Sequence, residues 1–180
     1  MLVTLSGLPG SGTSTVARPA AAALGIEHLD GGTAFRAFAA EEGLSLAELA
    51  QRAEVDPTID QALDRRLADR IAAGDVLVES RLAGWWAHRG GHAGLRVWID
   101  CDERERARRV GSRDGHDLAD ALATNRSREA SERARYLEYY GIDLTDLTIY
   151  DLVLDSTSTG PDEIVDRIVA AARGDARAAR

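Results

Sequence analysis

The chain has 180 residues, of which 44% are hydrophobic and 29% charged, and its formal net charge is -8. This length suits one hydrophobic core and is short for two, so we expect a single domain over residues 1–180. The acidic balance argues against a nucleic acid polymer as a partner. All 22 basic residues are arginine, so any phosphate site in this chain has to use arginine as its permanent cation.

Membrane, disulfide and zinc classes are also excluded by the sequence. Charges or glycines interrupt every apolar stretch well before it could span a bilayer, and no basic leader precedes the first apolar run. We therefore expect a soluble, cytoplasmic protein with no membrane partner, and we expect a monomer. The one cysteine, Cys101, has neither a second cysteine nor a nearby histidine cluster. The four histidines, His28 among them, are expected at the surface or in turns.

Strand-like and helix-like segments alternate along the chain. The predicted strands are residues 2–6, 27–29, 76–78, 95–99 and 151–154. The predicted helices are residues 14–24, 33–42, one opened by a capping box at 45–48, 56–73 and 161–173, with two arginine-rich helices between 106 and 135. This alternation predicts an α/β fold with a parallel sheet covered by helices on both faces.

The strongest motif is a glycine-rich loop at residues 7–15, GLPGSGTST, between the first strand and the first helix. It fits the phosphate-binding frame G-x-x-x-x-G-K-S/T, except that Thr13 stands where the lysine belongs. The residues expected at the phosphates of ATP are Gly7, Gly10, Ser11, Gly12, Thr13, Ser14 and Thr15. The hydroxyl of Ser14 occupies the Mg²⁺ position, whereas the missing lysine charge has to come from another part of the chain. A glycine-rich turn without a ligand is the alternative.

A second motif follows the second predicted strand. Residues 29–36, LDGGTAFR, resemble the L-D-x-G-x-x-Y/F-R element of cytidylate kinases, whose arginine grips the phosphate of the acceptor nucleotide. Three more stretches resemble the archaeal-type branch of these P-loop nucleoside monophosphate kinases: ESRLAGW at 79–85, YYGID at 139–143 and IYDLV at 149–153. The resemblance covers nearly the whole chain, and many members of that branch also have threonine at the lysine position. Ser80 departs from the branch, which has glycine there.

The resemblance implies a fold and an activity. The fold is the three-layer P-loop NTPase fold, with a parallel sheet of about five strands, acceptor-binding helices at about 33–73 and a lid at about 106–118. The activity is the Mg²⁺-dependent transfer of a phosphoryl group from ATP to CMP or dCMP. The sequence does not separate CMP from dCMP, UMP or AMP as the acceptor. Rival readings are an adenylate, shikimate or dephospho-coenzyme A kinase, or a nucleotide-binding module with little turnover.

The resemblance also assigns roles to individual side chains. The residues implied at the acceptor are Asp30, Arg36, Arg81, Glu132 and Arg135, and those implied at the transferring phosphoryl group are Arg109, Arg113 and Arg128. The helical spacing of Arg128, Glu132 and Arg135 lets the acid hold both guanidinium groups, although a solvated helix face is the alternative. Glu79 either orders a Mg²⁺-bound water or has a structural role, as a helix cap or in an ion pair. Gly111 and Gly115 are the expected lid hinge.

Overall fold

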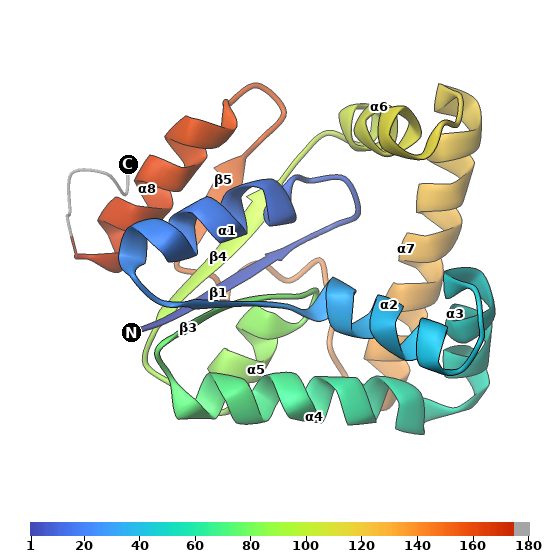
Figure 1. Cartoon of the computed structure of the whole chain (residues 1–180), viewed down its shortest axis with the longest axis horizontal. Helices are drawn as coiled ribbons and strands as arrows, with labels where there is room; N and C mark the ends of the chain where they lie inside the picture. The colour runs from blue at the N-terminus through green and yellow to red at the C-terminus, as the bar shows by residue number, and fades with distance from the viewer. Residues whose placement is uncertain (175–180) are drawn as a thin grey trace.

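The computed structural model describes residues 1–174 and contains one parallel sheet (Figure 1). Its strands are β1 (Leu2–Gly7), β2 (Glu27–Asp30), β3 (Val76–Glu79), β4 (Leu95–Asp100) and β5 (Leu152–Asp155). They lie in the order β2-β3-β1-β4-β5, with every pair parallel. The predicted five-stranded parallel sheet is therefore confirmed.

Helices cover both faces of this sheet. They are α1 (Thr13–Leu24), α2 (Gly31–Glu41), α3 (Leu46–Val55), α4 (Pro57–Ala73), α5 (Ala83–Arg89), α6 (Glu103–Asp114), α7 (Leu118–Tyr140) and α8 (Pro161–Ala172). Helices α1 and α8 lie on one face, and α4 and α5 lie on the other (Figure 1). The remaining helices gather beyond the carboxyl ends of the strands, beside the loop that joins β1 to α1 (Figure 1). The three-layer α/β architecture is confirmed.

The central strand β1 shows why its sequence is apolar almost without a break. All six of its residues are buried because β3 and β4 flank it and helices cover both faces. Val3 and Leu5 belong to the core under α1 and α8, whereas Leu2 belongs to the core under α4 and α5. Successive side chains of β1 thus pack against helices on opposite faces of the sheet, as the two-residue period of a strand requires.

Local capping signals fix two of the helices beyond the sheet. The side chain of Ser45 accepts a hydrogen bond from the backbone of Glu48, and the Glu48 side chain returns one to the backbone of Ser45, so the predicted capping box opens α3. Asp56 caps α4, and Pro57 occupies its first turn. These two helices and α2 form the outer wall of the carboxyl-end region (Figure 1).

The structure adds one helix that the sequence analysis did not predict. Helix α5 is seven residues long, and most of its side chains are buried, so it lacks the polar face of a typical surface helix. Trp85 of α5 belongs to an aromatic core with Trp98, Tyr136 and Tyr150, against which α7 rests. In the described residues, no helix is both long and apolar enough to span a membrane.

Candidate functional site

The glycine-rich loop lies where β1 ends and α1 begins. Gly10 and Gly12 adopt φ angles of 83° and 91°, which residues with a β-carbon rarely adopt. Helix α1 starts directly after Gly12, and no side chain in the described part of the chain caps it. The first amide groups of α1 therefore remain available to an anion, and the helix dipole favours negative charge there.

Side chains from other elements hold the loop in shape. Three arginines donate to alternate carbonyl oxygens of the loop: Arg81 to Gly7 (2.8 Å), Arg106 to Pro9 (3.3 Å) and Arg109 to Ser11 (3.4 Å). Ser156, which follows β5, also donates its hydroxyl to the carbonyl of Ser11 at 2.7 Å. The loop is thus fixed by guanidinium groups that come from the carboxyl ends of the neighbouring strands and from α6.

The hydroxyl of Ser14 and the carboxylate of Glu79 are in contact beside the loop. The Oγ of Ser14 donates to Oε1 of Glu79 at 2.5 Å, and Nε2 of His28 lies 3.2 Å from the other carboxylate oxygen. His28 lies in strand β2 with a side chain that is only 16% exposed, so the prediction that it lies at the surface or in a turn is wrong. A hydroxyl and a carboxylate are the oxygen ligands that suit Mg²⁺. In the residues 1–174, no three His, Cys, Asp or Glu side chains form a metal-binding group.

Glu132 of α7 holds two arginines, but they are not the predicted two. Nε of Arg81 donates to Glu132 at 2.9 Å, and Nε of Arg128 donates to the other oxygen at 2.8 Å. Burial opposes the charge of Glu132, but the two guanidinium groups outweigh burial and keep the pKa of this carboxyl below its usual value. The carboxylate therefore fixes Arg81 and Arg128 in one place.

Arg135 pairs with a different acid, so the predicted contact with Glu132 is wrong. Its Nε donates to Oδ2 of Asp60 on α4 at 2.8 Å, and its Nη1 donates to Ser131 at 2.6 Å. Both members of the Arg135–Asp60 pair are buried. Helix α4 lies near this part of α7 and presents Asp60 to the arginine, which the sequence of α7 alone does not reveal. This pair joins α4 to α7.

Asp30 and Arg36 lie together at the start of α2. Asp30 caps this helix by accepting from the amide of Gly32 at 2.8 Å, and it also accepts from the hydroxyl of Thr33 and from Arg36 at 3.2 Å. Burial opposes its charge, but these hydrogen bonds and the Arg36 guanidinium lower the pKa of the Asp30 carboxyl. The Arg36 side chain is held at one end yet is 56% exposed, so it can meet a ligand.

The two predicted lid arginines occupy different environments on α6. Arg109 reaches the loop and Ser156, while its Nε donates to Glu105 at 2.8 Å. Arg113 pairs with the neighbouring Asp114, and its side chain is 69% exposed. The structure therefore does not bring them together as a pair.

The two predicted hinge glycines also differ. Gly111 is buried inside α6, and a β-carbon there would lie 2.8 Å from the carbonyl oxygen of His116, so its small size serves packing. Gly115 ends α6 with a φ of 76°. Of the two, Gly115 has the backbone geometry that a chain reversal requires.

Ser80, the departure from the family pattern, lies beside Gly31 at the start of α2. A β-carbon at Gly31 would lie 2.9 Å from the Cβ of Ser80, so the serine fills space that Gly31 leaves at the start of α2. Three residues that contact the site were missed by the sequence analysis: His28, Asp60 and Ser156. Only Ser156 had a usable signal, because it follows a predicted strand whose carboxyl end lies at the same edge as the loop.

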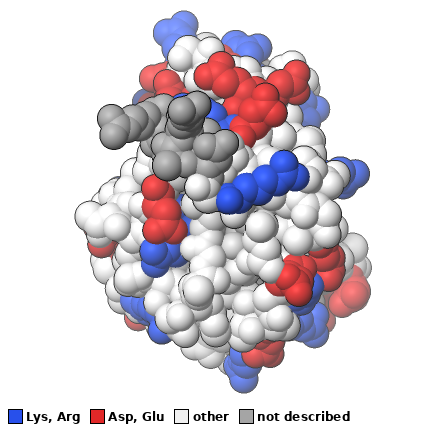
Figure 2. Space-filling view, turned by 90° about the vertical axis from the view of Figure 1, so that its left-hand side faces the viewer, with Lys and Arg blue, Asp and Glu red and all other residues white. Residues whose placement is uncertain are grey.

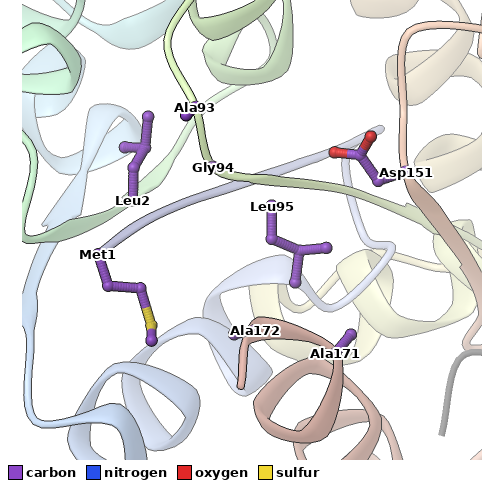
Figure 3. A pocket seen from close by; sticks show the side chains of 8 residues that line it. All are labelled: Met1, Leu2, Ala93, Gly94, Leu95, Asp151, Ala171 and Ala172. Carbon is purple, nitrogen blue, oxygen red and sulfur yellow. The ribbon is translucent and has the colours of Figure 1, made fainter. Parts of the chain in front are cut away.

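A hollow of about 390 Å³ lies at the opposite edge of the sheet, near the N-terminus. Figure 3 shows its lining, which includes Met1, Leu2, Leu95 and one acid, Asp151, but no arginine. Figure 2 shows that this side of the molecule has a broad uncharged area between scattered charged side chains. The carboxylate of this hollow is already paired with Arg96, and no guanidinium is among the lining residues, so the loop edge is the better candidate for a phosphate site.

Comparisons with known proteins give evidence on the family of this chain. The model of the cytidylate kinase-like family matches residues 2–158. A cytidylate kinase of Halobacterium salinarum is 47% identical over 170 residues, which cover 94% of this chain and 88% of the relative. A cytidylate kinase of Pyrococcus horikoshii is 40% identical over 171 residues, which cover 95% and 88%.

Solved structures add evidence on the fold alone. The shikimate kinase from Acinetobacter baumannii in complex with shikimate has a TM-score of 0.61 and 13% identity, covering 97% of this chain and 94% of that chain. The match confirms the predicted P-loop fold but carries no information on the acceptor. With a family match over residues 2–158 and relatives at 40% and 47% identity across most of its length, this chain belongs to the cytidylate kinase-like family.

Proposed function

We propose that this chain transfers the γ-phosphoryl group of ATP to the phosphate of CMP or dCMP. One observation carries the proposal: Arg81 touches the glycine-rich loop through the Gly7 carbonyl and touches Glu132, which also holds Arg128. The guanidinium of Arg81, expected at the acceptor, thus connects the expected ATP site to Arg128, which is expected at the transferring phosphoryl group. The names of the relatives supply the acceptor base, since they are cytidylate kinases.

The proposed reaction requires no protein side chain to form a covalent bond with a substrate. The acceptor is a phosphate monoester whose second pKa of about 6 leaves it ionised at neutral pH, so it needs no general base. The protein has to align two anionic groups and reduce their repulsion. Arg36, Arg81 and Arg128 suit this task, because each is fixed by a carboxylate at one end. Arg109 suits the ATP side, because it lies on the loop carbonyl of Ser11.

Mg²⁺ fits the residues present at the loop. Ser14 would hold the ion through its hydroxyl, and Glu79, which already accepts from that hydroxyl, would accept from a water on the ion. When bound, Mg²⁺ neutralises charge on the β and γ phosphates. Glu79 is buried, and His28 lies on its second oxygen, so the carboxylate is held in one orientation.

Two segments would move substrates or exclude water. Residues 33–73 are proposed as the acceptor-binding region, because α3 attaches to α7 through Tyr139, which donates to the carbonyls of Ala53 and Glu54. Residues 106–118 are proposed as the lid, because Arg109 extends from α6 to the loop and Gly115 ends that helix. The Asp60–Arg135 pair would set the position of α4 relative to α7.

The test is ADP release from Mg²⁺-ATP with CMP, dCMP, UMP, AMP or shikimate as the acceptor. Turnover with CMP or dCMP at least tenfold above the other three supports the proposal. Turnover with shikimate or AMP instead would assign a different small-molecule kinase. If ATP binds and no acceptor releases ADP, the chain is a nucleotide-binding module, and the proposed reaction is wrong.

A further inference from the structure

The loop residue that should carry a positive charge is a threonine. A β-carbon at Gly7 would lie 2.9 Å from Cγ2 of Thr13, so the Thr13 side chain lies over the start of the loop. A lysine at position 13 would follow the same direction and place its ammonium group beyond Gly7. Since threonine has no charge, the cation that faces the terminal phosphates of ATP has to come from another element.

Two of the three arginines on the loop use all three of their guanidinium nitrogens in contacts with the protein. In Arg106, Nε donates to the carbonyl of Cys101, Nη1 to Pro9 and Glu129, and Nη2 to Glu129. In Arg109, Nε donates to Glu105, Nη1 to Ser11 and Ser156, and Nη2 to the carbonyl of Ser156. Every guanidinium nitrogen of these two side chains has a protein partner, so their contacts shape the loop.

Arg81 differs from both. Its Nε donates to Glu132 and its Nη1 donates to the carbonyl of Gly7, while Nη2 has no partner among residues 1–174. The side chain is 20% exposed, so a ligand can reach it. Gly7 is also the residue over which Thr13 lies, so Arg81 approaches from β3 the place where a lysine at position 13 would end.

Neighbouring side chains leave a net positive charge at Arg81 and hold its guanidinium in one orientation. Glu132 is shared between Arg81 and Arg128, so this group of three side chains keeps a net positive charge. Arg81 also follows Glu79 by two residues, and Glu79 holds the hydroxyl of Ser14. Nη2 of Arg81 therefore lies at the same end of the loop as the residues expected to bind Mg²⁺-ATP.

We infer that Arg81 supplies to the terminal phosphates of ATP the positive charge that Thr13 lacks. This inference rests on the proposed use of ATP and gives Arg81 a role on the donor nucleotide, beyond the acceptor contact that the family resemblance implies. Glu132 acts as its positioning residue. The Gly7 carbonyl fixes one edge of the guanidinium, and the Nη2 edge binds the phosphate oxygens.

The first experiment measures ATP and ADP binding by calorimetry in the presence of Mg²⁺ and without any acceptor. Arg81→Met keeps the buried side-chain volume and removes the charge, and it should weaken binding of both nucleotides by about 10–100-fold. Arg126→Met is the matched control, because Arg126 pairs only with Glu103 on the surface and should bind ATP like the parent protein. Unchanged ATP affinity in a folded Arg81→Met protein, with weaker CMP binding alone, would overturn the inference.

The second experiment introduces a lysine at position 13, where the P-loop pattern has one. The double variant with Thr13→Lys and Arg81→Met should bind ATP at least tenfold more tightly than Arg81→Met, because the ammonium group reaches the space that Arg81 has left. A double variant that melts like the parent protein but binds ATP no better than Arg81→Met would refute the inference. Should Arg81→Met not fold, Arg81→Lys takes its place. Its shorter, single-nitrogen side chain should weaken ATP binding about tenfold, and unchanged ATP affinity would again refute the inference.

Because these assays contain no acceptor, they separate the two proposals. A parent protein that binds ATP but transfers no phosphoryl group to CMP would refute the proposed function and leave the role of Arg81 on ATP open to the same measurement. A parent protein that phosphorylates CMP while Arg81→Met keeps full ATP affinity would refute only the inference on Arg81.

Discussion

Asp64 on α4 provides a test of the interface between α4, α5 and α7. Its carboxylate accepts a hydrogen bond from the hydroxyl of Tyr140 at 2.8 Å, and it lines a hollow of about 330 Å³ with Trp86 and Tyr139. Burial raises the pKa of Asp64 to about 7, because the Tyr140 hydrogen bond does not make up for the lost hydration and the nearby Asp60 opposes a second negative charge.

This shift makes the folded protein less stable as the pH rises. The folded state keeps the proton of Asp64 up to about pH 7, whereas the unfolded chain releases it near the ordinary pKa of 3.8. Stability is therefore lost progressively between pH 4 and pH 7. A tenfold change in proton affinity corresponds to about 1.36 kcal/mol. The raised pKa of Asp64 therefore lowers the free energy of unfolding by about 2 kcal/mol at pH 5 and by about 4 kcal/mol at pH 8.

The substitution Asp64→Asn removes this titration and keeps the size and an acceptor for Tyr140. Urea unfolding gives the free energy of unfolding of both proteins at pH 5 and pH 8. The value for Asp64→Asn minus the value for the parent protein should increase by about 2 kcal/mol from pH 5 to pH 8. Asp69→Asn, an exposed acid on the same helix, is the control and should follow the parent protein at both pH values. Parallel pH profiles for Asp64→Asn and the parent protein would refute the reasoning.

Three further substitutions test the site. Ser14→Ala should raise the Mg²⁺ concentration needed for half-maximal turnover by at least tenfold, and a Mg²⁺ dependence equal to that of the parent protein would remove Ser14 from the metal site. Arg36→Ala should raise KM for CMP by about 10–100-fold and leave the Kd of ATP unchanged, as steady-state kinetics and calorimetry can measure. Arg135→Met leaves Asp60 buried without its partner and should lower the free energy of unfolding by about 3–5 kcal/mol in urea, whereas adding Asp60→Leu should restore most of that loss.

The parts of this fold that the sequence predicted are those in which neighbouring residues carry the signal. The loop at 7–15 follows a buried strand and opens a helix, and each of these features lies within a few residues of the next. The same holds for the capping box at Ser45 and Glu48. Helix α5 was not predicted, because its face toward the sheet and its aromatic core are both apolar and leave no amphipathic period.

The contacts of the site depend on distant segments, and the sequence predicted these less well. The spacing of Arg128, Glu132 and Arg135 on one helix is compatible with one acid between two arginines, but α4 brings Asp60 to Arg135. Arg81, which follows β3, then takes the free position on Glu132. Such a choice between partners depends on the packing of three elements, so no local pattern could decide it.

The distribution of ion pairs explains how an acidic chain can bind phosphate without a lysine. Most arginines that form ion pairs in the described residues meet an acid of their own, so those pairs carry no net charge. Glu132 and Glu105 are the exceptions, since each binds two arginines. The hydrogen bonds from Arg108 and Arg109 lower the pKa of Glu105 to about 2, so it stays ionised, and each group of three keeps one positive charge.

One arginine from each of these two groups reaches the loop: Arg81 at Gly7 and Arg109 at Ser11. Two groups of side chains that keep a net positive charge therefore lie beside the glycine-rich loop, although the net charge of the whole protein is -8. A surface that repels anions and a site that attracts them are compatible, because charges separated by more than about 10 Å of salt solution are largely screened. Arginines that share one acid thus keep a positive charge beside this loop, and of the two that reach it, Arg81 has a guanidinium nitrogen with no partner among residues 1–174.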